Sequence, residues 1–223
     1  MTGSSSRYRD EMKALVLAGS SVTVTDALKA LCQEADFVVA ADSGVRHAPA
    51  LGVTPDLIVG DFDSATEADL AHYPDVPRQT HPVRKDALDL ELALQEATVR
   101  GAAELLIVGA LGGRFDQTLA ALFIAARLKP QYDVTLHSGH SAAYPLCAGD
   151  TLTLHLPAGL TFSVLSLEAS RLSLTGASYP LTDADLPFGV GLGVSNETTA
   201  APLVATLHEG SALLLLNLRK SAP

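Results

Sequence analysis

The chain has 223 residues, of which 48% are hydrophobic, and a formal net charge of −10 at pH 7. This length is enough to bury a sizeable core, either in one large domain or in two small ones. The acidic balance argues against an extended nucleic-acid surface, because such a surface needs clustered Lys and Arg to displace counterions.

The sequence contains no segment typical of a membrane protein or of an exported one. No apolar run approaches the roughly 20 residues that span a bilayer. The N-terminus also lacks the successive regions of a signal peptide. We therefore expect a cytoplasmic protein without membrane or nucleic-acid partners, with a disordered leader at residues 1–12. We expect its two cysteines, Cys32 and Cys147, to be small core residues rather than a disulfide or a zinc site.

The first half of the chain alternates short apolar runs with longer segments of helical spacing, as in a parallel sheet with crossover helices. Strands are predicted at residues 14–18, 37–41, 57–60, 105–109 and 134–137. Helices are predicted at residues 25–34, 45–51, 87–100 and 115–128. The strands are nearly all apolar because such a sheet is covered on both faces. We expect an α/β domain with a mainly parallel sheet at residues 13–140.

In the second half the helical spacing gives way to strict alternation of apolar and polar residues, as at residues 151–156 and 162–167. Turn signals separate these runs, and they include Gly159, Gly176 and Gly210. This pattern predicts an all-β, sandwich-like domain at residues 145–223. No low-complexity linker precedes it, so we expect the two domains to pack closely.

Acidic residues follow the predicted parallel strands, where ligands of such sheets bind. Asp42 follows the second strand, and Asp61 and Asp63 follow the third. On an extended segment, Asp61 and Asp63 would point to one side, where a cation such as Mg²⁺ would relieve their repulsion. The structural alternative is a turn in which Ser64 caps a helix that begins near Thr66.

A second acidic group stands at the start of the helix predicted at residues 87–100. In one interpretation Asp86 is the N-cap and Asp89 favours the first turn, with no catalytic role. In the other, the helix start presents Asp89 to a metal ion while Lys85 meets a phosphate group. The residues themselves support both interpretations equally.

A pair of glycines follows the fourth predicted strand. Gly112 and Gly113 provide backbone that a nucleotide can approach closely, and Arg114 provides a guanidinium group suited to phosphate. The common nucleotide motifs with Gly-x-x-x-x-Gly-Lys or Gly-x-Gly-x-x-Gly are absent. The seven histidines contain no pair at i and i+4, so we expect surface or structural roles rather than a zinc site.

Taken in order, these segments resemble thiamine pyrophosphokinase over nearly the whole chain from Lys13. The matching segments are Ala-Asp-Ser-Gly (41–44), Pro-Asp-Leu-Ile-Val-Gly-Asp-Phe-Asp-Ser (55–64), Lys-Asp-Ala-Leu-Asp (85–89) and Gly-Ala-Leu-Gly-Gly-Arg-Phe-Asp-Gln (109–117). Tyr-Pro-Leu (179–181) and Gly-Val-Ser-Asn-Glu (193–197) resemble the β-domain motifs of that family. Their order and spacing argue against a chance match.

The resemblance implies an enzyme that transfers a pyrophosphoryl group from ATP to the hydroxyl of thiamine, giving thiamine diphosphate and AMP. It also implies a homodimer with thiamine pockets between the subunits, and Mg²⁺ held by Asp61, Asp63 and Asp89. Lys85 and Arg114 join these aspartates as expected catalytic residues. The residues expected around ATP are Asp42, Gly44, Asp86, Gly112, Gly113, Asp116 and Gln117, and those expected around thiamine are Ser195 and Asn196.

Two departures from the family pattern leave alternatives open. Leu88 stands where the family usually has Thr, so a hydroxyl that contacts phosphate or caps the helix is missing. The chain also has no Trp, which some members place against the thiamine ring. One alternative is a pyrophosphokinase that acts on a hydroxymethylpterin. The other is a catalytically silent nucleotide-binding regulatory module, of which Leu88 would be the first sign.

Overall fold

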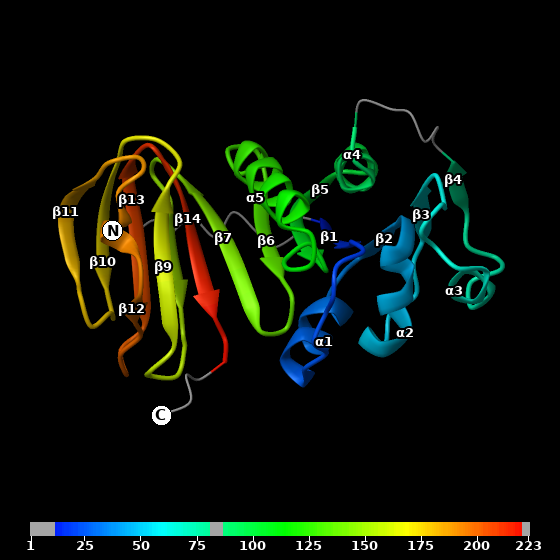
Figure 1. Cartoon of the computed structure of the whole chain (residues 1–223), viewed down its shortest axis with the longest axis horizontal. Coiled ribbons are helices and arrows are strands. Elements are labelled where there is room, and N and C mark those ends of the chain that lie inside the picture. The colour runs from blue at the N-terminus through cyan, green and yellow to red at the C-terminus, as the bar shows by residue number, and fades with distance from the viewer. Residues whose placement is uncertain (1–11, 81–86, 220–223) are drawn as a thin grey trace, which may run out of the picture.

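The computed structural model describes residues 12–80 and 87–219. Strands with helices on both sides occupy one end of the molecule, and antiparallel strands occupy the other (Figure 1). Residues 1–11 of the leader expected at residues 1–12 lie outside the described residues, as do Lys85 and Asp86, whereas Met12 begins the first strand. No helix in the described part of the chain is both long and apolar enough to cross a bilayer.

A ten-stranded sheet runs through both ends of the molecule, in the order β12-β9-β14-β7-β6-β5-β1-β2-β3-β4. From β4 to β6 the strands are parallel, and from β6 to β12 they are antiparallel. Its strands are β1 (Met12–Leu17), β2 (Phe37–Ala41), β3 (Leu57–Gly60), β4 (Arg78–Thr80), β5 (Ala102–Val108), β6 (Asp133–His137), β7 (Ser141–Cys147), β9 (Thr161–Ser166), β12 (Asn196–Glu197) and β14 (Ser211–Asn217). The predicted halves therefore share one sheet through the pairing of β6 with β7, and the division at residues 140–145 falls at this junction.

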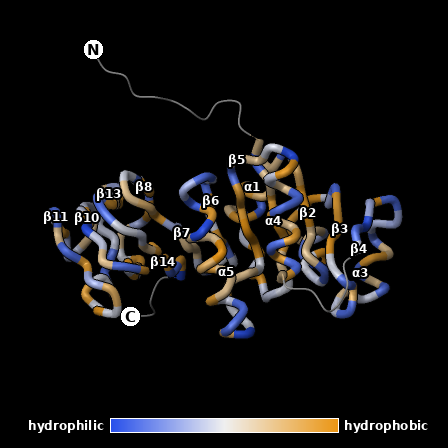
Figure 2. Tube along the Cα trace, turned by 90° about the horizontal axis from the view of Figure 1, so that it is seen from above, coloured by the Kyte–Doolittle hydropathy of each residue, from blue (hydrophilic) through white to orange (hydrophobic). Residues whose placement is uncertain are grey.

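Helices cover both faces of the parallel part, as Figure 1 shows. They are α1 (Asp26–Gln33), the 3₁₀ helix η1 (Asp42–His47), α2 (Ala48–Leu51), α3 (Glu67–Ala71), α4 (Asp89–Val99) and α5 (Phe115–Leu128). Alternate residues of β1 face opposite ways: Leu15 and Leu17 pack with α1 and α2, whereas Ala14 and Val16 pack with α4 and α5. This two-sided burial explains the nearly continuous apolar strands predicted from the sequence, and Figure 2 shows the same hydrophobic stretches along β2, β3 and β5.

Several predicted boundaries differ from the structure. The helix expected at residues 45–51 is divided into η1 and α2, with Pro49 near the start of α2. The helix expected from residue 87 begins at Asp89, and Leu88 occupies its N-cap position. The Ser64 cap was also wrong, since Thr66 caps α3 and forms a capping box with Asp69.

A second sheet completes the antiparallel end of the molecule. It consists of β8 (Thr151–Leu154), β10 (Ser170–Thr175), β11 (Leu181–Leu186) and β13 (Leu203–Glu209), in the order β11-β10-β13-β8. Leu172, Leu174 and Leu207 of this sheet pack with Leu214 of β14, whereas the adjacent Leu213 belongs to the α/β core. The fold is thus an α/β domain followed by a β sandwich, and β14 contributes to both cores because alternate side chains face opposite ways.

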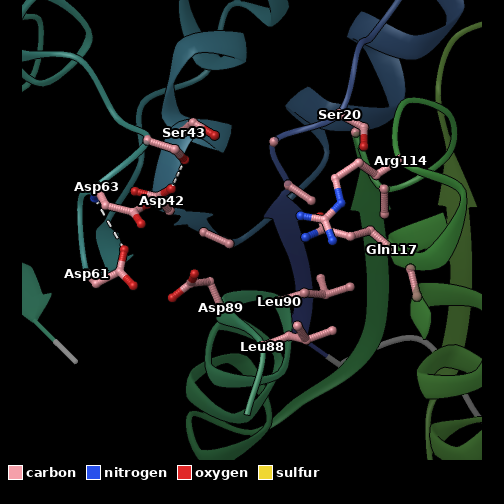
Figure 3. Close-up of a pocket in the computed structure, with 17 residues that line it drawn as sticks. Ser20, Asp42, Ser43, Asp61, Asp63, Leu88, Asp89, Leu90, Arg114 and Gln117 are labelled. Atoms are coloured by element: carbon pink, nitrogen blue, oxygen red, sulfur yellow. Dashed lines mark hydrogen bonds between the residues drawn. The ribbon is translucent and has the colours of Figure 1, made fainter. Parts of the chain in front are cut away.

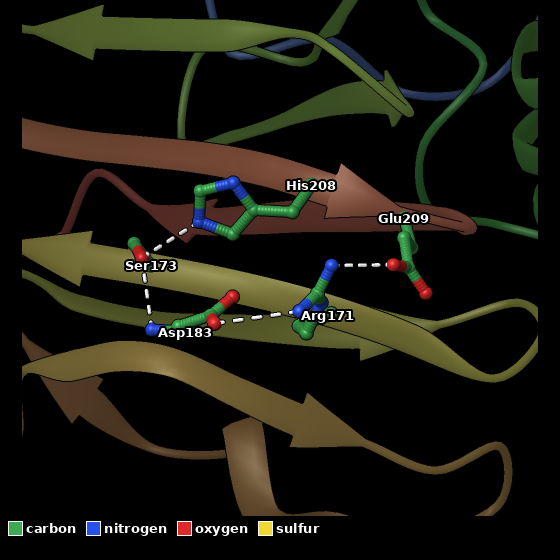
Figure 4. A network of polar contacts seen from close by, with 5 residues as sticks. All are labelled: Arg171, Ser173, Asp183, His208 and Glu209. Atoms are coloured by element: carbon green, nitrogen blue, oxygen red, sulfur yellow. Dashed lines mark hydrogen bonds and ion pairs between the residues drawn. The ribbon is translucent and has the colours of Figure 1, made fainter.

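A polar network ties three strands of the second sheet together (Figure 4). Arg171 of β10 pairs with Glu209 of β13 and with Asp183 of β11, and its Nη1 lies 3.4 Å from the Asp183 carboxylate. Ser173 accepts a hydrogen bond from the Asp183 backbone N–H and contacts His208 Nε2 at 2.8 Å. These are cross-strand contacts on an exposed face, where each ion pair adds little stability.

Candidate active site

A pocket of about 460 Å³ opens beyond the carboxyl ends of the parallel strands. It is lined by the residues that follow β1, β2, β3 and β5 and by the first turns of α4 and α5. The chain adds β2, β3 and β4 on one side of β1 and then returns to place β5 on the other side. Such a reversal of strand order creates the crevice in which open α/β sheets bind ligands.

The pocket has an acidic wall and a basic wall (Figure 3). Asp42, Asp61, Asp63 and Asp89 lie on one side, and the Arg114 guanidinium points into the pocket from the other. A ligand with several phosphate groups suits this arrangement, because a guanidinium group can bind phosphate directly and carboxylates can hold it through a metal ion.

Three carboxylates converge from separate segments of the chain. Asp42 follows β2, Asp61 follows β3, and Asp89 is the first residue of α4, yet one oxygen from each lies within 4.8 Å of the others. Asp42 is buried, and its Oδ1 has no hydrogen-bond partner. A buried oxygen without a donor, beside two like charges, fits a divalent cation with hard oxygen ligands such as Mg²⁺.

Asp63 lines the pocket but does not belong to this group of three. Phe62 has a φ of 60°, so the segment is not the extended one expected, although Asp61 and Asp63 both line the pocket. The backbone N–H of Asp63 donates to Asp61 Oδ1 at 3.2 Å. The negative charge of Asp61, with smaller effects from Asp42 and Asp89, raises the pKa of the exposed Asp63 carboxyl.

The backbone around Asp42 is under unusual constraint. Asp42 has a φ of 47°, which is uncommon for a residue with a side chain. Gly60, with a φ of 153°, packs against it, and a Cβ at Gly60 would lie 3.0 Å from Asp42 Cβ. Gly44, expected near ATP, must also be glycine for a structural reason. A Cβ at this position would lie only 2.1 Å from the Leu17 carbonyl oxygen.

Arg114 already has a partner within the chain. Its guanidinium donates two hydrogen bonds to Asp116, of 3.2 and 2.6 Å, and these bonds hold the pKa of the Asp116 carboxyl below its usual range. Gln117 lines the pocket with Arg114, whereas Gly112 lies at a neighbouring pocket. Gly112 and Gly113 have φ values of 97° and 72°. Glycine adopts such positive φ values at little cost, which explains the two glycines in this turn.

Leu88 also lines the pocket and begins α4 without a side-chain cap. Its φ of −71° and ψ of 151° are typical of an N-cap residue. Its backbone N–H donates to the Glu91 carboxylate at 3.3 Å, which provides half of a capping box. The absence of a hydroxyl at Leu88 therefore leaves α4 without a side-chain cap.

Ser195 and Asn196, expected around thiamine, lie in the antiparallel half and do not line the acidic pocket of the same chain. Asn196 is 7% exposed, and its side chain bonds to the backbone of Tyr179 at both N–H and C=O and to Glu197 N–H. Ser195 is exposed and has a φ of 61°, and its N–H donates to Ser163 Oγ.

The structure adds polar residues that the sequence interpretation did not assign to the site. Ser20 and Ser43 line the pocket, and the Ser64 hydroxyl donates to Asp42 Oδ2. Ser20 follows β1, so the rule that drew attention to Asp42 and Asp61 would also have found this loop. Cys32 is a core residue as expected, whereas Cys147 is only partly buried and donates from its N–H to Asp150 at 2.9 Å.

Comparison with known proteins gives matches over both halves of the chain. The model described as "Thiamin pyrophosphokinase, catalytic domain" matches residues 28–136, and "Thiamin pyrophosphokinase, vitamin B1 binding domain" matches residues 151–207. A curated relative, the thiamine pyrophosphokinase of Bacillus subtilis, is 27% identical over 187 residues, which cover 82% of this chain and 87% of the relative.

Solved structures share the fold over almost the whole chain. A thiamine pyrophosphokinase from Bacillus subtilis has a TM-score of 0.81 at 22% identity and covers 93% of this chain and 99% of its own. A thiamin pyrophosphokinase family protein from Enterococcus faecalis has a TM-score of 0.75 at 25% identity, with coverage of 93% and 100%. With both family models matched in order on this fold, the chain belongs to the thiamin pyrophosphokinase family.

Proposed function

We propose that this protein transfers a pyrophosphoryl group from ATP to the hydroxyl of thiamine, releasing AMP and thiamine diphosphate. The observation that carries the proposal is the convergence of three carboxylates opposite Arg114 at the strand ends. Family membership supports the choice of substrates, since the matched models name thiamin pyrophosphokinase and vitamin B1 binding.

ATP binds in the acidic pocket with its phosphates between the two walls. The thiamine hydroxyl attacks the β-phosphorus in line, a new O–P bond forms, and the bond to the α-phosphate breaks to release AMP. Arg114 holds phosphate oxygens, and either Asp61 or Asp89 accepts the hydroxyl proton. Mg²⁺, when bound to the aspartates, neutralises charge on the phosphates. The catalytic role of Lys85 and the ATP-binding role of Asp86 stay predictions from the sequence.

Thiamine binds between two copies of the chain, with the acidic pocket of one copy and the Ser195 segment of the other. Ser195 lies in the other half of the molecule, away from the lining of the acidic pocket. Large apolar side chains are exposed on α5 and on the segment before Ser195, and such surfaces often mark interfaces; they are Phe115, Phe123, Phe188, Val190, Leu192 and Val194. A homodimer would bury this surface, and light scattering on the purified protein should give the mass of two chains.

The decisive experiment mixes the purified protein with Mg²⁺-ATP and either thiamine or a hydroxymethylpterin, followed by mass spectrometry of the products. AMP together with thiamine diphosphate supports the proposal. AMP together with a pterin diphosphate would assign the other acceptor. Nucleotide binding without either product would indicate the silent regulatory module.

A further inference from the structure

The loop that follows β1 connects the two walls of the pocket. The backbone N–H of Ser20 donates to the carbonyl oxygen of Gly109, just after β5, at 2.7 Å. On the acidic side, Gly19 packs against the residue after Asp42, since a Cβ at Gly19 would lie 2.5 Å from Ser43 Oγ. Gly19 and Ser20 both line the pocket, so the position of this Gly19–Ser20 loop affects how the two walls face each other.

Two side chains of η1 bind both carbonyl groups of the Gly19–Ser20 loop. Arg46 Nη2 donates to the Gly19 oxygen, and His47 Nε2 lies 2.8 Å from the Ser20 oxygen. A carbonyl oxygen can only accept, so the His47 ring must carry its hydrogen on Nε2. Burial and, to a smaller extent, the Arg46 charge lower the pKa of His47, so a neutral ring makes this bond at neutral pH.

Arg46 and His47 act on the pocket from outside it. Among the described residues, the pocket lining includes Ser20 but neither Arg46 nor His47. Their effect on a ligand must therefore pass through the Gly19–Ser20 loop. Ser20 carries it to the basic wall, because a Cβ at Gly113 would lie 3.3 Å from Ser20 Oγ and the next residue is Arg114. Figure 3 shows Ser20 on the same side of the pocket as Arg114.

We propose that Arg46 and His47 are positioning residues for nucleotide binding, and that they hold the Gly19–Ser20 loop so that Arg114 faces the acidic wall at the spacing a polyphosphate needs. The inference rests on the ATP-dependent function proposed above, and it adds two residues outside the pocket on which that function depends. Without one of these hydrogen bonds the loop can shift, and a displacement of about 1 Å is enough to impair a site of this kind.

Binding of a nucleotide analogue to the full-length protein tests the proposal without an acceptor. The probe is the uncleavable α,β-methylene ATP with Mg²⁺, and its affinity is measured by isothermal titration calorimetry. His47→Leu should weaken binding by about tenfold, because it removes the donor from a half-buried bond. Arg46→Met should weaken binding by about threefold, because Arg46 is exposed and water replaces part of its bond. Wild-type affinity in both variants would overturn the proposal.

The chain offers a matched control for each variant. Arg78 donates to the Leu70 carbonyl oxygen at 3.2 Å, and His72 Nδ1 lies 2.9 Å from the Ala68 carbonyl oxygen. Within the described part of the chain, neither Arg78 nor His72 belongs to the pocket lining. Arg78→Met and His72→Leu should therefore change the affinity by less than about twofold. Losses as large as those of the η1 variants would indicate general destabilisation and contradict a positioning role.

A conservative variant separates the hydrogen bond of His47 from its packing. His47→Gln keeps a neutral N–H donor and should recover most of the affinity that His47→Leu loses. Melting curves should show that both variants remain folded at the temperature of the titration. Equal losses of affinity in His47→Gln and His47→Leu would rule out the hydrogen bond as the cause.

A double-mutant cycle tests the path to the basic wall. Arg114→Met should weaken binding by itself, and His47→Leu should weaken it much less in that background than in the wild type, because the two residues act on one interaction. Additive losses would overturn this path. Wild-type protein that binds the analogue but forms no thiamine diphosphate would overturn only the proposed function, whereas wild-type protein that does not bind the analogue would overturn both.

Discussion

The acidic pocket and the Ser195–Asn196 corner differ in how completely their buried polar groups are hydrogen-bonded. At the pocket, Asp42 keeps one oxygen unpaired in a strained backbone. At the corner, the equally buried Asn196 makes three hydrogen bonds to backbone groups. Both segments were expected to contact substrates because both resemble family motifs.

This contrast distinguishes residues that bind a ligand from residues that stabilise the fold. An unpaired buried oxygen weakens the protein until a ligand binds, so substitution should reduce function more than stability. A fully paired amide stabilises the fold, so substitution should reduce stability first. Each prediction below tests one side of this difference.

The largest effect is expected at the pocket. Asp61→Asn should reduce turnover at least about a hundredfold, since a charge that holds the reacting phosphates through the metal is lost. Its melting temperature should stay close to that of the wild type. Turnover is measured as AMP formation, with the exposed turn variant Asp75→Asn as the control. Near-normal activity in Asp61→Asn would remove this residue from the site.

At the corner, the expected effect is on stability. Asn196→Ala should lower the free energy of unfolding by about 2–3 kcal/mol, because each of its hydrogen bonds contributes about 1 kcal/mol net. Urea denaturation measures this loss, and Ser195→Ala is the neighbouring control with little expected change. If Asn196→Ala proved as stable as the wild type, the proposed difference between the two regions would fail.

A smaller gain in stability is expected at the start of α4, where Leu88 both lines the pocket and occupies the N-cap position of the helix. Leu88→Thr supplies the missing cap oxygen to the first turn, which should raise the free energy of unfolding by about 0.5–1 kcal/mol. Leu88→Ala, which cannot cap, should give no gain. Chemical denaturation of both variants compares them, and equal stabilities would exclude a capping effect.

The last prediction concerns His137 in β6, the strand that pairs with β7 where the α/β and sandwich halves join. Burial lowers the pKa of its imidazole below the ordinary 6.5, and Nδ1 accepts the Gly139 N–H at 2.9 Å. The unfolded chain therefore binds the proton more readily. The stability present above pH 6.5 is lost as pH falls below it, by at most about 1.4 kcal/mol per pH unit.

His137→Asn keeps an acceptor and removes the titration. Melting curves between pH 5.5 and 7.5 should therefore be flatter for the variant than for the wild type. Some slope will persist because burial also lowers the pKa of His47. Identical slopes in the two proteins would rule out His137 as a source of the pH dependence.

The strands buried on both faces were largely predictable, because their composition is dictated by the two helix layers that cover them. The polar edge strand β4 (Arg78–Thr80) carries no apolar signal and was missed. β7 was also missed, because it joins the two halves and resembles neither the parallel strands nor the alternating ones.

Residue type and order were sufficient to indicate the family, the α/β and sandwich halves, and an acidic site at the strand ends. Which aspartates meet was decided only by the tertiary structure. With the left-handed turn at Phe62, Asp63 lies in the pocket lining but outside the group of three, and the packing of β2 against β3 brings Asp42 to Asp61. Convergence of this kind depends on contacts between segments far apart in the chain, and local patterns do not contain that information.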